Sequence, residues 1–300
     1  MMKLYAALIG LSLIWGLSFV FIKLMVEPAG VWGTVFLRCL AGVMILLPFL
    51  WMKRKSIVRP IPWKSLIIVG IFNAGLPWGL ISLSETEINS STAAVLNALT
   101  PICTGLIGYL VFAVSLKGRQ WLGIILGFIG IMILMDFNVA QLAGENFIGV
   151  GTMVLATICY GFASQYTKKN LREAGVLLIT AFSLLVGGVV GGIGMMFTEP
   201  IEAAAFLEPS FLISLIGLGC FGSGIAHLLF YYMTTKRSAE FATSVTYLIP
   251  VTAMVWGHLL LGDAITKNLI IGLLIIFLGV YLATRKPKRQ PDSLLHQRTG

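Results

Sequence analysis

Residues 4–26 read LYAALIGLSLIWGLSFVFIKLMV, and the class of fold follows from this stretch. It carries a single charge, Lys23, in a run long enough to cross the hydrocarbon core of a bilayer, which takes roughly 20 apolar residues in a helix. The run is too long for the apolar region of a secretory signal peptide, and no A-x-A cleavage motif follows it. We therefore expect a retained transmembrane helix.

The composition of the whole chain agrees with this first span. Of its 300 residues, 58% are hydrophobic and 11% are charged, whereas a soluble domain carries roughly 25% charged residues. The net charge of +9 comes from basic residues in short loops between apolar runs, a distribution typical of membrane proteins and unlike a nucleic-acid-binding surface. We expect the lipid bilayer as a partner, and no nucleic acid.

Ten apolar segments are long enough to span the bilayer, and lipid requires them to be helices because it offers backbone groups no hydrogen-bond partner. These segments are residues 4–26, 31–52, 63–83, 90–110, 120–137, 148–167, 176–197, 211–234, 241–261 and 268–284. Charged residues and prolines mark breaks, as at Glu27-Pro28, Arg59-Pro60 and Glu199-Pro200. The end of the fourth segment stays open, because residues 111–116 extend it in a second interpretation. The predicted fold is an all-α membrane protein with ten transmembrane helices.

The distribution of charge favours this count and gives an orientation. With the N-terminus in the cytoplasm, 18 of the 21 Lys and Arg residues lie in cytoplasmic segments, while Lys267 lies outside and Lys23 and Arg38 lie within spans. Basic residues are held on the cytoplasmic side of a membrane, and a missing or extra span would invert every later loop. We predict a multi-pass protein of the plasma membrane with both termini in the cytoplasm.

The two halves of the chain resemble each other. An offset of 149 residues aligns Gly70 with Gly219, Gly75 with Gly224, Ala93 with Ala242, Pro101 with Pro250, Gly123 with Gly272 and Gly130 with Gly279, and an offset of 145 aligns Trp15-Gly16 with Tyr160-Gly161 and Lys23 with Lys168. Each half holds five spans, and an odd number makes the second half enter the membrane from the opposite side. We therefore predict two inverted five-helix repeats, residues 1–140 and 141–284, followed by a basic cytoplasmic tail, residues 285–300. Secondary transporters use this arrangement with a site between the repeats, and channels also contain inverted repeats.

Short motifs recur in a set order along the chain. The first span carries Trp15-Gly16-Leu17-Ser18-Phe19 with Lys23, and the second carries Phe36-Leu37-Arg38. Each half then has a proline, a two-residue corner and a glycine that opens its last helix; the corner is Gly262-Asp263 in the second half and Ala113-Val114 in the first. In this order the chain resembles the EamA-type transporters of the drug/metabolite transporter superfamily, with W-G-x-x-F followed by Lys, F-x-R and a G-E-like corner. The first corner departs from that pattern, because it lacks the acid. The resemblance covers nearly all of residues 4–284 and implies ten helices, two repeats and export of metabolites or drugs.

Ionisable groups inside a span are costly, so each is a candidate for function. Lys23 either anchors its helix by extending toward water or belongs to a site. Arg38 lies deeper, where it either contacts carbonyls or carboxylates of the bundle or holds an anionic group of a substrate, such as a carboxylate. Glu85 and Glu87 are expected in a solvated loop beyond the third span, so no carboxylate is expected deep in the membrane.

Polar and aromatic side chains away from the loops are candidates for a binding cavity, because small-molecule sites combine a few polar groups with aromatic walls. The alternative is that they hold neighbouring helices together. The predicted substrate-binding residues are Trp15, Ser18, Arg38, Asn73, Trp78, Asn97, Tyr160, Ser164, Ser223, His227, Tyr231 and Thr246. His227, like His258, is either a hydrogen-bonded structural histidine or a proton relay. Pro101 and Pro250 are expected to kink their helices near mid-span.

These features predict a secondary transporter that exports amino-acid-like metabolites or drugs across the plasma membrane by alternating access. A channel and an intramembrane enzyme are the alternatives. The chain has no G-x-x-x-x-G-K-[ST] phosphate loop and no H-E-x-x-H or G-x-S-x-G motif, and Cys39, Cys103, Cys159 and Cys220 lack metal or disulfide spacing. We therefore expect a small-molecule substrate as partner and no enzyme activity, cofactor or metal, and we predict no particular oligomeric state.

Overall fold

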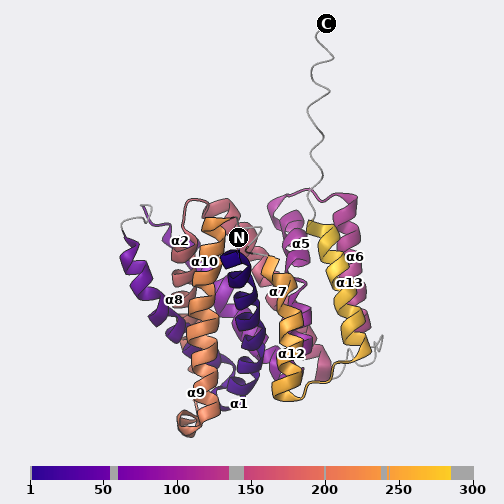
Figure 1. Cartoon of the computed structure of the whole chain (residues 1–300). Coiled ribbons are helices and arrows are strands. Elements are labelled where there is room, and N and C mark those ends of the chain that lie inside the picture. Colours follow the sequence, from indigo (N-terminus) through magenta and orange to yellow (C-terminus); the bar gives the residue numbers. More distant parts are fainter. Residues whose placement is uncertain are drawn as a thin grey trace.

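The computed structural model describes residues 2–54, 60–134, 145–198, 201–237, 242 and 244–284, and every regular element in these ranges is a helix. Figure 1 shows the helices gathered into one bundle, with the N-terminus at the upper end. The predicted basic tail, residues 285–300, and the predicted break at Glu199-Pro200 lie outside the described residues.

Several helices are long and apolar enough to cross a membrane. The described residues contain five such helices, or six if the pair formed by Ser90–Asn97 and Thr100–Phe112, bent by 41°, is one broken span. The elements are α1 (Met2–Met52), α2 (Trp63–Gly70), η2 (Ile71–Gly75), α3 (Leu76–Glu87), α4 (Ser90–Asn97), α5 (Thr100–Phe112), α6 (Gly118–Leu134), α7 (Glu145–Asn170), α8 (Val176–Met195), η4 (Ala203–Leu207), α9 (Pro209–Leu215), η5 (Ile216–Ile225), α10 (Ala226–Lys236), η6 (Ser244–Tyr247), α12 (Ile249–Leu261) and α13 (Lys267–Thr284). The chain is therefore a multi-pass membrane protein.

Helix α1 covers the first two predicted spans. Its 51 residues correspond to about 77 Å at 1.5 Å per residue, far more than the ~30 Å of a hydrocarbon core. The backbone leaves the helical region at Gly30, which has φ +67° and ψ 174°, a conformation open to glycine because it has no Cβ. In Figure 1 the chain descends from the N-terminus and then turns back upward at the left. The break lies where the sequence predicts it, between residues 26 and 31.

The third and eighth predicted spans each contain a stretch of π-helix. These are η2 in the first half and η5 in the second, and an offset of 149 residues places η2 within η5. A π-helical stretch widens the turn and often marks a functional position. Asn73 in η2 and Gly222 in η5 both line the central cavity described below.

The fourth predicted span is the least regular. It is divided into α4 and α5 by a break at Ala98 and Leu99, and α5 ends at Phe112, so residues 113–116 do not extend it. Pro101 lies in the first turn of α5, and Pro250 lies in the first turn of α12, where a missing N–H disturbs no helical bond. The two prolines thus follow the breaks and open new helices.

Glycines at equivalent positions of the two halves approach equivalent partners. A Cβ built on each of them would lie within 3.1 Å of its neighbour, which shows how closely the helices pack. The contacts, written in equivalent pairs, are Gly70–Val186 with Gly219–Ala41, Gly75–Val190 with Gly224–Ile45, Gly42–Ser223 with Gly187–Ala74, and Gly123–Gly279 with Gly130–Gly272. Each contact becomes the other member of its pair when residues of one half are replaced by their equivalents in the other half. The offset is 145 residues for the first two spans of each half and 149 residues for the later spans.

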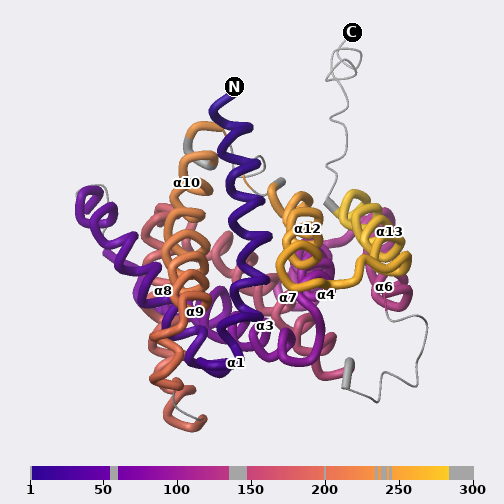
Figure 2. Tube along the Cα trace, turned by 60° about the horizontal axis from the view of Figure 1, so that its bottom comes forward, coloured from indigo at the N-terminus to yellow at the C-terminus, as the bar shows by residue number. Residues whose placement is uncertain are grey.

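Contacts between the halves also determine where the central space lies. α1 packs against η5, α8 and α12, while α7 packs against α3 and α5. α6 and α13 pack mainly against each other, as a pair at the right of Figure 1 and again at the side of the bundle in Figure 2. Their outward side chains, such as Phe128 and Leu274, are exposed and apolar, as lipid contact requires. The residues that line the cavity come from α1, η2, α3, α4, α5, α7, η5, α10, η6 and α12.

Candidate functional site

A cavity of about 320 Å³ lies at the centre of the bundle, within the size range of small-molecule sites. Ten of the twelve predicted substrate-binding residues line it: Trp15, Ser18, Arg38, Asn73, Trp78, Asn97, Tyr160, Ser164, His227 and Thr246. They come from both halves of the chain, from residues 15 to 100 and from residues 160 to 250. The two halves therefore share one central site.

Arg38 is the charged residue of the cavity wall. It is 6% exposed, its guanidinium carbon lies 3.7 Å from the centroid of the Trp78 ring, and its Nε donates to Ser223 Oγ at 3.2 Å. Ser223 Oγ in turn donates to the Leu218 carbonyl at 3.1 Å. Ser223 therefore lies behind the wall, fully buried, and orients Arg38 instead of lining the cavity. Of the described residues, Ser223 alone accepts a hydrogen bond from Arg38.

Aromatic rings form much of the remaining wall. Trp15 Nε1 donates to the Gly222 carbonyl at 3.0 Å, which joins α1 to η5. The Trp15 ring meets His227 edge-on with centroids 5.5 Å apart and lies 6.0 Å from Phe230. His227 Nδ1 is buried and makes no hydrogen bond within the described part of the chain. The T-shaped contact with Trp15 orients the imidazole ring toward the cavity.

Two hydroxyl groups of the wall are already bonded to nearby backbone carbonyls. Ser18 Oγ donates to the Ile14 carbonyl at 2.9 Å, and Thr100 Oγ1 donates to the Asn97 carbonyl at 2.7 Å. Each hydroxyl retains lone pairs that can accept from a ligand, because a hydroxyl both donates and accepts.

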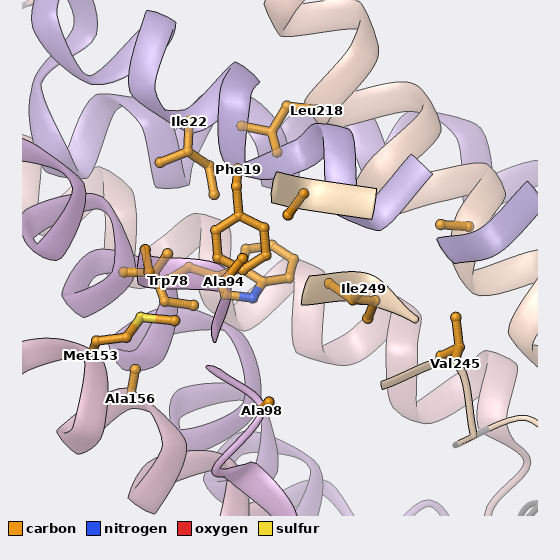
Figure 3. Close-up of a cluster of buried hydrophobic side chains, with 14 of the residues drawn as sticks. Phe19, Ile22, Trp78, Ala94, Ala98, Met153, Ala156, Leu218, Val245 and Ile249 are labelled. Atoms are coloured by element: carbon orange, nitrogen blue, oxygen red, sulfur yellow. The ribbon is translucent and has the colours of Figure 1, made fainter. Parts of the chain in front are cut away.

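Sequence reasoning missed the apolar part of the wall. Figure 3 shows the missed residues Phe19, Ile22 and Ala94 gathered around the predicted Trp78, with Ile249 facing them, and all of these line the cavity. On α1 the lining residues follow the helical spacing 15, 18, 19 and 22, so extending the stripe from Trp15 and Ser18 finds them. Tyr231 does not line the cavity, whereas its neighbour Phe230 does, because successive side chains on a helix point about 100° apart.

The position of Glu85 differs from the one predicted from the sequence. The expectation of a solvated loop position is wrong, because α3 continues to Glu87 and Glu85 is 0% exposed within it. Glu87, two residues on, is exposed. Ile81, one turn before Glu85, lines the cavity, so this carboxyl lies just beyond the cavity wall.

Lys23 neither extends toward water nor lines the cavity. It is half-buried, and its ammonium donates to the backbone carbonyls of Glu85 and Ile88, the latter at 3.3 Å. A cation is favourable at the C-terminal end of a helix, where carbonyls lack helical partners. Lys23 therefore joins α1 to the end of α3.

Two hydrogen bonds join the halves of the chain at the same end of the bundle. Asp263, which follows α12, accepts through Oδ2 from the Ser91 backbone N–H at 3.0 Å and from Ser91 Oγ at 2.8 Å. His258 is exposed and contacts the Asp263 carbonyl through Nδ1 at 3.0 Å. We refer to Lys23, Glu85, Ser90, Ser91 and Asp263 together as the Glu85 end of the cavity.

Known proteins resemble this chain over nearly its whole length. An uncharacterized inner membrane transporter of Escherichia coli, YedA, is 27% identical and covers 97% of this chain and 96% of its own. An uncharacterized transporter of Bacillus subtilis, YoaV, is 22% identical over 95% of this chain and 97% of its own, and one of Archaeoglobus fulgidus is 24% identical over 91% and 95%.

A solved crystal structure shares the fold, with a TM-score of 0.64 and 16% identity over 94% of this chain and 96% of that chain. The EamA-like transporter family matches residues 2–136 and, a second time, residues 147–285. Relatives named as transporters point to a membrane transporter and away from an enzyme. The chain belongs to the EamA-like transporter family.

Proposed function

We propose that this chain is a secondary transporter whose cavity binds small solutes carrying a carboxylate, amino-acid-like metabolites or drugs among them, and exports them across the plasma membrane. The observation that carries the proposal is Arg38, a buried guanidinium that stacks on Trp78 and lines the cavity. Arginine presents a planar set of donors that matches a carboxylate, and a dry wall strengthens such a contact. Phe19 and Ile249 supply apolar surface for the rest of the solute.

Ten transmembrane helices are part of this proposal. Its support is that α1 breaks at Gly30, that the bent pair α4 and α5 covers one predicted span, and that three shorter apolar helices occupy the places of the fifth, ninth and tenth spans. Of these, α6 has 17 residues and α13 has 18, or about 26–27 Å, close to the ~30 Å of the hydrocarbon core.

Two inverted repeats, residues 1–140 and 141–284, are also part of the proposal. The family matches once in each range, and the reciprocal glycine contacts interchange when the halves are exchanged. Both halves place a π-helical stretch and a left-handed helix end at equivalent positions. An odd number of spans in each half gives opposite orientations, and rocking one repeat against the other would open the cavity to alternate sides. With both termini in the cytoplasm, the Glu85 end faces outward.

A counterflow assay in proteoliposomes tests the function. Vesicles loaded with one unlabelled solute are diluted into the labelled solute, with a panel of amino acids and other carboxylates and with and without a pH gradient. We expect exchange of at least one carboxylate. Arg38→Gln should lower that exchange by about tenfold or more, because a hydrogen bond to a charged group contributes about 1.5–3 kcal/mol.

Arg172→Gln is the matched control, because Arg172 is exposed and its Nε donates to the Lys168 carbonyl outside the cavity. It should leave exchange unchanged. Comparing vesicles of the two orientations tests the export direction. Exchange of every carboxylate that is unaffected by Arg38→Gln would refute the anion-binding role of Arg38, and currents through an open pore would favour a channel.

A further inference from the structure

The Glu85 carboxyl is buried, and over the described ranges no side chain or backbone group is hydrogen-bonded to it. It is 0% exposed, and neither of its oxygens makes a hydrogen bond with any described residue. The hydroxyl of Ser90, close enough to act on this carboxyl, is likewise buried and unbonded within the described ranges. The two carboxyl oxygens of Glu85 and the hydroxyl oxygen of Ser90 are thus buried close together. Glu85 lies one helical turn beyond Ile81, which is in the cavity wall.

Three charged residues from two parts of the chain act on Glu85. Lys23 and Arg38 lie on α1, and Asp263 follows α12. The Lys23 ammonium is occupied by the carbonyls of Glu85 and Ile88, and Asp263 Oδ2 is occupied by Ser91. The charges nearest to Glu85 are therefore engaged with backbone and hydroxyl groups, and they leave its carboxyl without a direct bond.

Three of the other elements around α3 bring no charge to this place. α4, η2 and α8 pack against α3 and contain no ionisable residue apart from those already named. α7 meets this part of α3 at Gly149, whose carbonyl accepts from Ser84 Oγ at 2.6 Å. His258 reaches the Asp263 carbonyl and is exposed, so it faces solvent near Asp263 and not the Glu85 carboxyl.

An ionised carboxylate needs hydrogen bonds from its surroundings, and among the described groups only the Ser90 hydroxyl stands close enough to supply one. A neutral carboxylic acid is compatible with this enclosed place. If the Glu85 end opened, water would hydrate the carboxyl and favour the ionised form. A group that holds a proton in one conformation and releases it in the other couples proton binding to the equilibrium between the two conformations.

We propose that Glu85 is a proton-binding site at which one proton from the water outside is taken up when this end of the cavity closes. The Glu85 carboxylate gains the proton and becomes a carboxylic acid on closure, and it returns the proton to water on opening, with no other bond made or broken. The proposal rests on the proposed function only in that the cavity opens at the Glu85 end. With such a site, closure of the Glu85 end depends on the external pH.

Thiol accessibility in sealed right-side-out vesicles tests the proposal without a known substrate. The four native cysteines, three of them buried, are replaced, and Ala94→Cys places one thiol in the cavity wall. A membrane-impermeant maleimide is added outside at pH 5.5 to 8. The rate at Ala94→Cys is divided by the rate at Lys267→Cys, an exposed reference at the start of α13, which removes the pH dependence of the thiol itself.

We expect this ratio to fall as the external pH is lowered, by at most about tenfold per pH unit because one proton is linked. Glu85→Gln should hold the ratio at its low, acidic value at every pH, while Glu85→Asp should retain a pH dependence. Glu87→Gln is the matched control, since it removes an exposed carboxylate two residues away on the same helix, and it should behave as the parent. His258→Asn should also behave as the parent.

A pH dependence that survives Glu85→Gln, or a labelled cavity whose ratio is independent of pH, would overturn the proton site and leave the transport proposal standing. An Ala94→Cys thiol that never reacts from outside, while Lys267→Cys does, would show that this end does not open. That result would overturn alternating access and the proton site together.

Discussion

The corners that end α5 and α12 have the same backbone and different chemistry. Ala113 (φ 55°) and Gly262 (φ 73°) are both left-handed, and the next backbone N–H bonds a carbonyl six residues earlier in each half. At the second corner, Asp263 accepts two hydrogen bonds from Ser91 in the first half of the chain. At the first corner, Val114 is exposed and has no side-chain acceptor. The repeat has kept its geometry and changed its side chains.

The same asymmetry extends to the lysines at equivalent positions. Lys23 is half-buried and donates to the end of α3, whereas Lys168 at the end of α7 is exposed. Thr234 is the residue equivalent to Glu85 at an offset of 149. The halves are therefore alike in these packing contacts and different in these ionisable groups.

The largest loss of stability is expected at the contact between α6 and α13, where equivalent glycines of the two halves meet. Gly123→Ala would place a Cβ 2.5 Å from the Gly279 carbonyl oxygen and 2.9 Å from the Ala283 nitrogen, both backbone atoms that cannot move aside. We expect a loss of about 1–3 kcal/mol of stability, measured by thermal unfolding in detergent. Gly272→Ala should cost less, because its nearest neighbour is the flexible side chain of Leu134 at 2.7 Å.

Gly118→Ala is the control for this substitution, because a Cβ there meets nothing within 4 Å. It should leave the unfolding temperature unchanged. If Gly123→Ala unfolded at the same temperature as Gly118→Ala, the close pairing of α6 with α13 would be wrong.

A comparable loss of stability is expected at the second corner. Asp263→Ala removes the acceptor of both Ser91 bonds and leaves a buried N–H and hydroxyl unpaired. We expect a loss of about 1–3 kcal/mol, the usual range for leaving buried donors without partners. Val114→Ala at the equivalent position should change stability little. Equal effects of the two substitutions in thermal unfolding would contradict the difference between the corners.

The smallest effects concern the backbone that the corners share. Ala113→Gly should stabilise the protein by about 0.5–1 kcal/mol, because an L-residue is strained in the left-handed region and glycine is not. Gly262→Ala should destabilise it by a similar amount. Thermal unfolding of the two variants should therefore shift in opposite directions, and shifts of the same sign would show that the corners do not share a conformation.

The sequence predicts the positions of the helices because uninterrupted apolar runs leave few alternatives in lipid. It also predicts most of the polar cavity wall, from Trp15 to Thr246, because polar and aromatic groups at mid-span have few other uses. Apolar lining residues such as Phe19 cannot be recognised in this way, because hydrophobic residues that face lipid and those that face the cavity look alike in a single sequence. Residue type alone predicts Tyr231 in the wall, but the direction in which a side chain points from its helix depends on packing.

Glu85 shows a different limit. A charged residue near the end of an apolar run is naturally assigned to the loop, and uncertainty of one helical turn in that end decides between solvent and interior. The π-helical stretches η2 and η5, which shift the register of the helices that contain them, leave no signal in hydropathy either. These features depend on contacts between the halves, which a pattern along one chain does not record.

Inverted orientation of the two halves is the claim on which this account depends, and one labelling experiment tests it. Single cysteines are placed at Gly118 and Lys267, equivalent positions at an offset of 149 that are both exposed, and intact cells are treated with a membrane-impermeant thiol reagent. The account predicts that Lys267→Cys reacts at once and that Gly118→Cys reacts only after the membrane is opened. Reaction of both from the same side would contradict it.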